Sequence, residues 1–304
     1  MKKILVLIFF SVTLFSCKSE KKSIRKEINT ETFETSNFEL IKTIGDTKAV
    51  LILFGGFGEN PTDIKREFKI LDITKKNQIT LILMNYSKKL WLEEFEKKEL
   101  AKLLQETLEK HNLNKKDIYI GGFSSGGIMS LQISNYIIGM KEFYIDPKGV
   151  FIVDSPIDLL ELYKASKKNI SRDFSSVSVE ESKWLINTLE KKLGNPEKGI
   201  SKYEKYSTYT LETDYIKNLK KLNKTKIRLY TEPDTIWWKE NRMADYEQMN
   251  AFHIKKLYES LKRHNFKEVE YIPTKNKGYR ADGERHPHSW SIINKEDLIN
   301  WILN

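Results

Sequence analysis

The chain has 304 residues, of which 39% are hydrophobic, so a single domain with a sizeable core is possible. Its formal net charge is +10, and only 8 of its 52 basic residues are arginine. Nucleic-acid-binding proteins usually rely on arginine for bidentate contacts to bases and phosphates. Because the lysines alternate with glutamates along the chain, we interpret them as a solvated surface and expect no nucleic-acid partner.

The first residues have the pattern of an export signal. Residues 1–3 include two lysines, and residues 4–15 form an apolar run of about a dozen residues, too short to span a bilayer comfortably. The run ends in LFSC, and the polar segment KSEKKSIRKE follows. A small residue, a cysteine and a polar tether in this order resemble the lipobox of bacterial lipoproteins. The resemblance implies that Cys17 is lipidated and becomes the mature N-terminus.

The lone cysteine supports this interpretation. Cys17 is the only cysteine of the chain, so no intrachain disulfide can form, and a lone thiol in an exported protein needs another explanation. We expect residues 1–16 to be a signal peptide and residues 17–37 a tether. Acyl chains on Cys17 would then hold the protein on a bacterial membrane in the cell envelope. An ordinary signal peptide with a chance cysteine is the alternative.

Strand and helix patterns alternate along the rest of the chain. Residues 49–58 form a continuous apolar run typical of a buried parallel strand, and further strands are predicted at residues 79–86, 117–123, 149–156, 225–234 and 267–273. Helical patterns lie at residues 61–76, 90–111, 126–139, 246–264 and 295–304. Repeated alternation of this kind predicts an α/β fold, with a mostly parallel sheet flanked by helices. A mostly helical, charged insertion occupies residues 157–224.

Residues 122–126, GFSSG, fit the pattern G-x-S-x-G between a predicted strand and a predicted helix. This is the sequence context of a nucleophile elbow, in which small residues must flank a strained turn. Gly122 and Gly126 provide that space. The hydroxyl of Ser124 would stand at the helix N-terminus, where the backbone N–H of Ser125 can face a developing oxyanion. The pattern therefore predicts Ser124 as the nucleophile and assigns no chemistry to the Ser125 hydroxyl.

With this motif, the chain from about Phe38 to its end resembles the α/β-hydrolase family. The resemblance implies an α/β-hydrolase domain over residues 38–304, and a serine hydrolase that cleaves an ester or similar acyl bond through an acyl-enzyme. In that family a glycine-rich loop after an early strand supplies a second oxyanion amide. Residues 53–60, LFGGFGEN, occupy that place, with Phe54 where the family usually has histidine. Either Gly56 or Phe57 is the expected donor.

The family's catalytic triad runs in the order serine, acid, histidine, which places the base late in the chain. His286 and His288 lie in GERHPHSWSI, after the last predicted strand. His288 is the expected base because it precedes Ser-Trp and the closing helix, and His286 is the alternative. The remaining histidines lie at the ends or in the middle of predicted helices and are interpreted as structural: His111, His253 and His264.

Several carboxylates could act as the acid of the triad. Asp234 stands just past the strand IRLYT and is the expected acid, which would fix the tautomer of His288. Glu232 lies nearer the sheet and Asp282 lies in the histidine loop. Asp154, after the strand GVFIV, is at an alternative position for the acid in this family.

The surroundings of the site are predicted from the insertion and the tryptophans. The resemblance implies that residues 157–224 form a helical lid. Trp237, Trp238 and Trp290 are expected near the pocket mouth, where they could stack on sugar rings or line an acyl pocket, or simply pack in the core. We expect a small-molecule or glycan ester as substrate.

No cofactor is implied by the sequence. His-Pro-His has i, i+2 spacing in a loop, which does not predict a metal site, and neither a phosphate-binding loop nor a dinucleotide fingerprint is present. A peptidase of the same fold and a non-catalytic binding lipoprotein remain the alternative functions.

Overall fold

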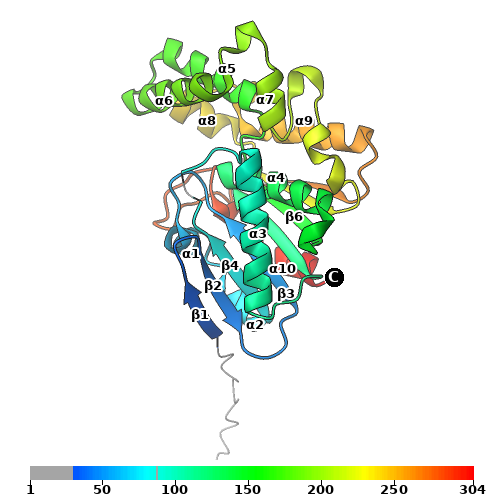
Figure 1. Cartoon of the computed structure of the whole chain (residues 1–304). Coiled ribbons are helices and arrows are strands. Elements are labelled where there is room, and N and C mark those ends of the chain that lie inside the picture. The colour runs from blue at the N-terminus through cyan, green and yellow to red at the C-terminus, as the bar shows by residue number, and fades with distance from the viewer. Residues whose placement is uncertain (1–29, 87) are drawn as a thin grey trace, which may run out of the picture.

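The computed structural model describes residues 30–86 and 88–304. Cys17, the expected signal peptide and most of the expected tether lie outside the described residues. An eight-stranded sheet in the order β1-β2-β4-β3-β5-β6-β7-β8 forms the centre, with helices on both faces (Figure 1). The strands are β1 (Thr30–Glu34), β2 (Phe38–Thr43), β3 (Ala49–Phe54), β4 (Ile79–Met84), β5 (Ile118–Phe123), β6 (Pro147–Val153), β7 (Lys226–Thr231) and β8 (Val269–Pro273).

The six strands from β3 to β8 pair in parallel, whereas β2 pairs antiparallel with both β1 and β4. The predicted mostly parallel sheet is confirmed, and each of the six predicted strands is present. Strands β1 and β2 were not predicted from the sequence, and β1 lies within residues 17–37, which were expected to be a tether. Both strands are added at the outer edge of the sheet, and β1 is exposed along most of its length.

The helices flanking the sheet correspond closely to the predicted ones. The helix expected over residues 61–76 is instead two helices, because Lys69 takes a left-handed conformation with φ of 50° and ends the first. The α-helices are α1 (Pro61–Phe68), α2 (Leu71–Lys76), α3 (Glu94–Lys110), α4 (Ser125–Gly139), α5 (Leu159–Arg172), α6 (Ser176–Leu193), α7 (Ser201–Tyr206), α8 (Thr235–Arg242), α9 (Asn250–Arg263) and α10 (Lys295–Leu303).

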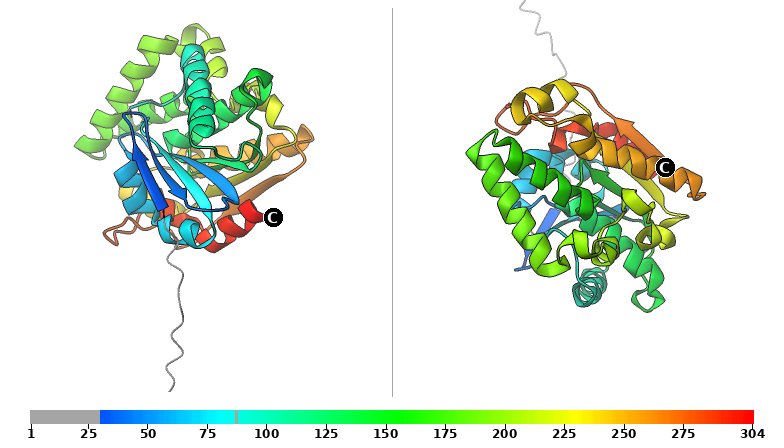
Figure 2. Two further views of the ribbon diagram at one scale, coloured as in Figure 1. Left: turned by 60° about the horizontal axis from the view of Figure 1, so that its bottom comes forward. Right: turned by 90° about the horizontal axis from the view of Figure 1, so that it is seen from above.

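Alternating side chains of the central strands fill two hydrophobic layers, one on each face of the sheet. In β3, Leu51 and Leu53 pack in one cluster with α1 and α10, while Ile52 and Phe54 pack in the other with α3 and α4. Figure 2 shows the strands between these helix layers. The period of two explains why the central strand β3 is a continuous apolar run, since both of its faces are buried.

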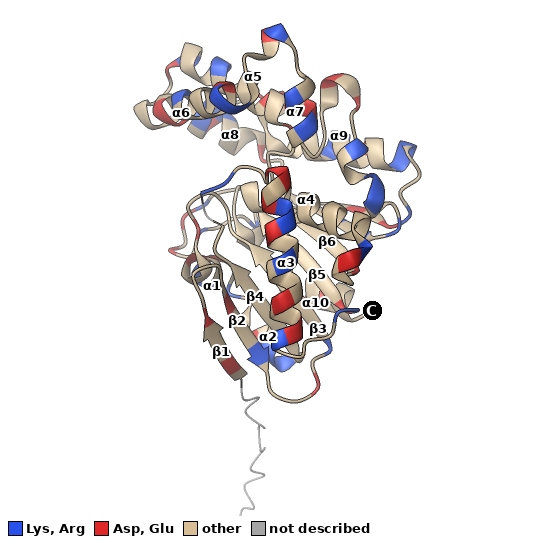
Figure 3. Ribbon diagram, in the orientation of Figure 1, with Lys and Arg blue, Asp and Glu red and all other residues tan. Residues whose placement is uncertain are grey.

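Helices α5, α6, α7 and α8 gather beyond one end of the sheet, where they cover the turns that follow β5 and β6 (Figures 1 and 2). Exposed helices carry acidic and basic side chains side by side (Figure 3), as expected of a solvated surface. In the part of the chain that the structure describes, no helix is both long and apolar enough to cross a membrane.

The N-terminal end of α4 lies against the ends of β3 and β5 with no room for a side chain. A Cβ atom on Gly126 would lie 2.3 Å from the carbonyl oxygen of Phe54, and one on Gly122 would lie 2.1 Å from the carbonyl oxygen of Gly126. Both contacts are with backbone, which cannot rotate away. At the other end of α4, a Cβ on Gly139 would meet nothing closer than 3.7 Å.

We therefore expect Gly126→Ala to lower the free energy of unfolding by about 2 kcal/mol or more, because overpacking against fixed backbone strains the fold. Gly139→Ala is the matched control in the same helix. It should be neutral or stabilising by up to about 1 kcal/mol, since alanine favours a helix more than glycine does. Urea denaturation measures both. Equal stability of the two variants would show that the end of α4 is not packed as described.

Candidate active site

The predicted strand-to-helix turn is present at Ser124. This residue follows β5 directly, precedes the first residue of α4, and has φ of 52° and ψ of −125°. Positive φ is strained for a residue other than glycine. The turn is held because the Ser124 N–H donates to the carbonyl of Val153 at 2.9 Å, and the Gly127 N–H donates to the carbonyl of Ser124 at 3.0 Å. This is the backbone arrangement of a nucleophile elbow.

His288 lies on the loop that follows β8, and its ring is hydrogen-bonded to Asp154. The distance from His288 Nδ1 to Asp154 Oδ2 is 2.6 Å. The His288 ring also packs on Phe123, with ring centroids 4.5 Å apart. The aspartate therefore fixes the orientation of the imidazole, and a proton on Nδ1 leaves Nε2 as the basic nitrogen.

Asp154 is positioned by the neighbouring strand and by α9. It is only 3% exposed and has φ of 43°. Its Oδ1 accepts a hydrogen bond from Thr231 Oγ1 at 2.8 Å, and its backbone N–H donates to the carbonyl of Tyr230 at 2.9 Å. Asn250 Nδ2 donates to the carbonyl of Asp154. A buried carboxylate needs such partners, and these hold it toward His288.

The expected contact between Asp234 and His288 is wrong. Asp234 Oδ1 caps α8 by accepting from the backbone N–H of Trp237 at 3.0 Å, and Oδ2 accepts from Arg285 Nη2 at 2.6 Å. The same guanidinium pairs with Glu232, which also accepts from backbone N–H groups of the loop after β8. Arg285 thus forms ion pairs with both carboxylates that follow β7. Asp282 is exposed and accepts only from the Glu284 N–H.

His286 lies next to His288 but does not take its place. Its Nδ1 accepts from the backbone N–H of His288 at 3.2 Å, and its ring packs on Trp237 with centroids 4.6 Å apart. Burial lowers the pKa of His286 to about 3, and the charges of Arg280, His288 and Arg242 add to the effect. His286 is therefore neutral over the physiological pH range.

The glycine-rich loop after β3 approaches Ser124 closely. A Cβ atom on Gly56 would lie 3.3 Å from Ser124 Cβ. The Gly56 N–H is already engaged, since it donates to Glu59 Oε2 at 2.8 Å. Among residues 30–86 and 88–304, no hydrogen bond uses the N–H of Phe57 or of Ser125. Of the two donors expected in this loop, Phe57 is thus the one with a free amide.

Glu59 ties this loop to the histidine loop. Its Oε2 accepts from both the Gly56 N–H and Trp290 Nε1, the latter at 3.1 Å. Burial raises the pKa of Glu59, and these hydrogen bonds and the positive charge of Arg280 oppose the rise. The carboxylate therefore links the loop that carries Phe57 to the segment two residues beyond His288.

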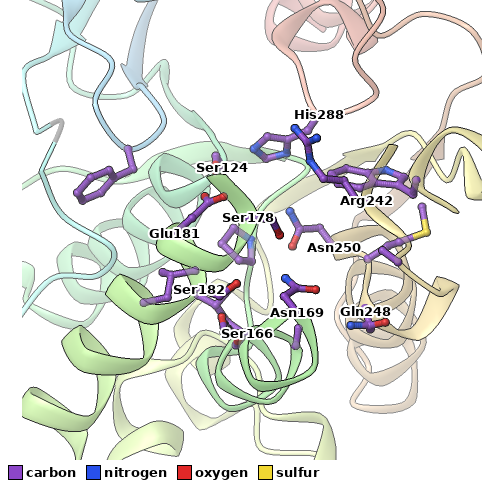
Figure 4. A pocket seen from close by; sticks show the side chains of 18 of the residues that line it. Ser124, Ser166, Asn169, Ser178, Glu181, Ser182, Arg242, Gln248, Asn250 and His288 are labelled. Carbon is purple, nitrogen blue, oxygen red and sulfur yellow. Dashed lines mark hydrogen bonds between the residues drawn. The ribbon is translucent and has the colours of Figure 1, made fainter. Parts of the chain in front are cut away.

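A pocket of about 380 Å³ opens above Ser124 and His288, between the sheet and the covering helices. Figure 4 shows Ser124 and His288 toward one end of it, with Ser166 and Asn169 of α5 toward the other. Helix α6 contributes Trp184, whose ring packs on Phe57 with centroids 4.7 Å apart. Trp184 was not predicted to line the pocket, because no local sequence motif relates it to the turn at Ser124.

Of the three tryptophans expected near the pocket, only Trp238 lines it. Trp290 is 1% exposed and stacks on Phe68 in the core, with centroids 4.5 Å apart. Trp237 packs on His286 instead of lining the pocket. His111, His253 and His264 also lie outside this pocket. Within the described residues, no group of three or more His, Cys, Asp or Glu side chains could hold a metal ion.

Comparisons with known proteins agree with this architecture. The chain matches no protein-family model and no curated protein sequence. Among solved structures it is similar to a double mutant of the esterase E40, with 13% identity and a TM-score of 0.55, over 92% of this chain and 86% of that one. It is also similar to substrate-bound FphF, a fluorophosphonate-binding serine hydrolase of Staphylococcus aureus, with 13% identity and a TM-score of 0.56, over 91% and 98%.

A third similar structure is carboxyl esterase 2 of the mycorrhizal fungus Tuber melanosporum, with 14% identity and a TM-score of 0.55, over 92% of this chain and 87% of that one. At this level of identity the likeness concerns the fold. The chain has the α/β-hydrolase fold that these structures share, as the sequence resemblance predicted.

The neutral His286 makes stability depend on pH. Its pKa is about 3 in the folded protein and near 6.5 when unfolded, so only the unfolded chain gains the proton as pH falls below about 6.5. The free energy of unfolding should therefore fall by roughly 1–2 kcal/mol between pH 7 and pH 5 because of this residue. His286→Gln should reduce that loss, whereas His264→Gln, an exposed control at the end of α9, should not. Thermal unfolding at both pH values measures the difference, and identical pH profiles for wild type and His286→Gln would contradict the assignment.

Proposed function

We propose that this protein is a serine hydrolase that cleaves ester bonds, with Ser124 as the nucleophile, His288 as the general base and Asp154 as the acid of the triad. The observation that carries the proposal is the convergence of three features on one pocket. Ser124 occupies a strained elbow, His288 lines the same pocket, and His288 is held by a buried aspartate at 2.6 Å. Sequence order also fits, because serine, acid and histidine follow one another along the chain.

The chemistry follows from the roles of these groups. Asp154 accepts a hydrogen bond from the Nδ1–H group of His288, so Nε2 takes the proton of the Ser124 hydroxyl as the serine oxygen attacks the ester carbonyl. The tetrahedral intermediate collapses when His288 returns this proton to the leaving alcohol, and the acyl group stays on Ser124. Water, activated by the same histidine, then releases the acid and restores the serine. The carboxylate of Asp154 stabilises the imidazolium that forms in each half-reaction.

The negative charge on the carbonyl oxygen needs hydrogen-bond donors. The N–H of Ser125 lies at the N-terminus of α4, where the helix dipole also favours a negative charge. The free N–H of Phe57 is the second donor, on a loop that comes close to Ser124. Glu59 supports this assignment, because it occupies the competing N–H of Gly56.

Residues 157–224 fit the role of a lid. Their helices α5 and α6 supply much of the pocket wall that faces Ser124. Leu162 and Leu185 give this wall an apolar part, and its serine and asparagine side chains give it a polar one. A pocket of this mixed character suits a small-molecule or glycan ester better than a long acyl chain.

We also propose that the mature protein is anchored to a membrane of the bacterial cell envelope through Cys17. Support comes from the sequence alone, in the apolar run and the LFSC motif. Metabolic labelling with an alkyne fatty acid should mark the full-length protein and leave Cys17→Ser unmarked. A labelled Cys17→Ser protein would rule the anchor out.

The acid of the triad is tested by comparing two aspartates. Asp154→Asn should lower kcat for a small ester about 10⁴-fold, close to the level of Ser124→Ala, because an amide at this place stabilises the wrong tautomer of His288. Asp234→Asn should keep kcat within about tenfold and lower the free energy of unfolding by about 1 kcal/mol, since it weakens only the contact to Arg285.

Steady-state kinetics on a 4-nitrophenyl ester measure both variants, with circular dichroism to confirm folding. The reverse result, an inactive Asp234→Asn beside an active Asp154→Asn, would contradict the proposed triad.

A further inference from the structure

Two arginines beside the proposed triad lack a carboxylate partner. Residues 30–86 and 88–304 contain seven arginines, and only Arg242 and Arg280 form no ion pair with an acidic side chain of this part of the chain. Both of them line the pocket. The other five pair with Asp or Glu: Arg66, Arg172, Arg228, Arg263 and Arg285.

The two arginines reach the pocket from different segments, and both lie near enough to His286 to affect its pKa. Arg242 ends α8, and Figure 4 shows it beside His288. Its Nη1 donates to the backbone carbonyl of Asn241 at 3.0 Å, and its guanidinium lies 5.9 Å from the centre of the Trp237 ring. Arg280 is half-buried on the loop after β8, and within the described residues no hydrogen bond uses its guanidinium. Most of their donors therefore remain available.

No acidic side chain among residues 30–86 and 88–304 forms an ion pair with either arginine. Glu181 is the acidic residue among those lining the pocket, and it is exposed on α6. Glu59 lies near enough for Arg280 to affect its pKa, but its Oε2 is committed to the Gly56 N–H and to Trp290. The two guanidinium groups also act together on His286, whose pKa both of them lower. The pocket therefore presents two guanidinium groups that form no ion pair within the described residues.

We propose that Arg242 and Arg280 form an anion subsite, and that the substrate is an ester bearing a carboxylate close to the scissile bond. The proposal rests on the proposed hydrolase function and deepens it. A guanidinium presents a planar fork of donors that matches a carboxylate, and it is less strongly hydrated than a lysine ammonium. Arg280 is partly buried, which strengthens such a contact because less water screens it, whereas Arg242 is exposed.

The other residues that line the pocket suit a substrate that carries hydroxyl groups as well as the carboxylate. Beside apolar side chains such as Leu162 and Leu185, the wall includes neutral polar ones: Ser166, Asn169, Ser178, Ser182, Gln248 and Asn250. Hydroxyl and amide groups can exchange hydrogen bonds with an uncharged polyol without repelling its acidic group. An ester of an acidic carbohydrate combines both features, the carboxylate and the hydroxyls.

Matched pairs of esters test the subsite on either side of the scissile bond. For the leaving group the pair is 3-carboxyphenyl acetate and 3-carbamoylphenyl acetate. For the acyl group it is mono-4-nitrophenyl adipate and the corresponding terminal amide. In the wild-type protein, kcat/KM should favour the carboxylate over the amide at least about tenfold in one of the pairs, because a charged hydrogen bond contributes about 1.5–3 kcal/mol. The preference should shrink as salt is added.

The variant Arg242→Gln/Arg280→Gln should bring this ratio close to one, while Arg242→Lys/Arg280→Lys should keep part of it. Arg263→Gln is the matched control, since Arg263 pairs with Asp214 away from the pocket. It should keep the full ratio. No carboxylate preference in either pair, or a ratio unchanged in the double glutamine variant, would overturn the subsite.

Binding to Ser124→Ala separates the subsite from the catalytic proposal. By calorimetry, this protein should bind 3-hydroxybenzoate or the monoamide of adipic acid at least about tenfold more tightly than the matched uncharged amide, and the two glutamine substitutions should remove the difference. If the wild-type protein cleaves none of the esters but Ser124→Ala binds in this way, the hydrolase function fails and the subsite stands. If esters are cleaved and the binding preference is absent, the subsite fails alone.

Discussion

The proposed site depends on one hydrogen bond, from His288 Nδ1 to Asp154 Oδ2, which joins residues far apart in the chain. Asp154 lies directly after β6, while His288 lies beyond β8, so the two meet only when the parallel strands are in register. A carboxylate that is 3% exposed is tolerated only with hydrogen-bond partners. Thr231 at the end of β7 supplies one of them, and the imidazole supplies the other.

The loops around this pair are fixed by two further carboxylate networks. Arg285 joins the histidine loop to Glu232 and Asp234, which follow β7. Glu59 joins the same loop, through Trp290, to the glycine-rich loop after β3. The proposed general base and the proposed oxyanion donor are thus tied to each other as well as to the sheet. Preorganised dipoles of this kind are the usual source of transition-state stabilisation in acyl transfer.

Local patterns were sufficient to predict the six parallel strands β3 to β8, most helices and the elbow at Ser124, but not the edge strands β1 and β2. Each predicted feature depends on residues adjacent in sequence, such as a continuous apolar run or glycines two positions from a serine. The acid could not be chosen in this way. Asp154 and Asp234 both follow a parallel strand, and both lie between Ser124 and His288 in the chain. What distinguishes them is Arg285, which engages Asp234 and leaves the imidazole to Asp154.

The tryptophans show the same limit of sequence reasoning. Trp290 is two residues from His288, yet its ring turns into the core against Phe68. Trp184 lies on α6, far from His288 in the sequence, and lines the pocket. The sequence could not show that Arg242 and Arg280 lack an ion-pair partner either, because ion pairing depends on which side chains lie nearby in space.

The central claim is that Ser124 is an activated nucleophile. Labelling of the folded protein with a fluorophosphonate, followed by peptide mass mapping, tests it directly. A single phosphonyl adduct on Ser124, absent from Ser124→Ala, is the result that this account predicts. A folded protein that stays unlabelled, or an adduct on Ser125, would contradict it.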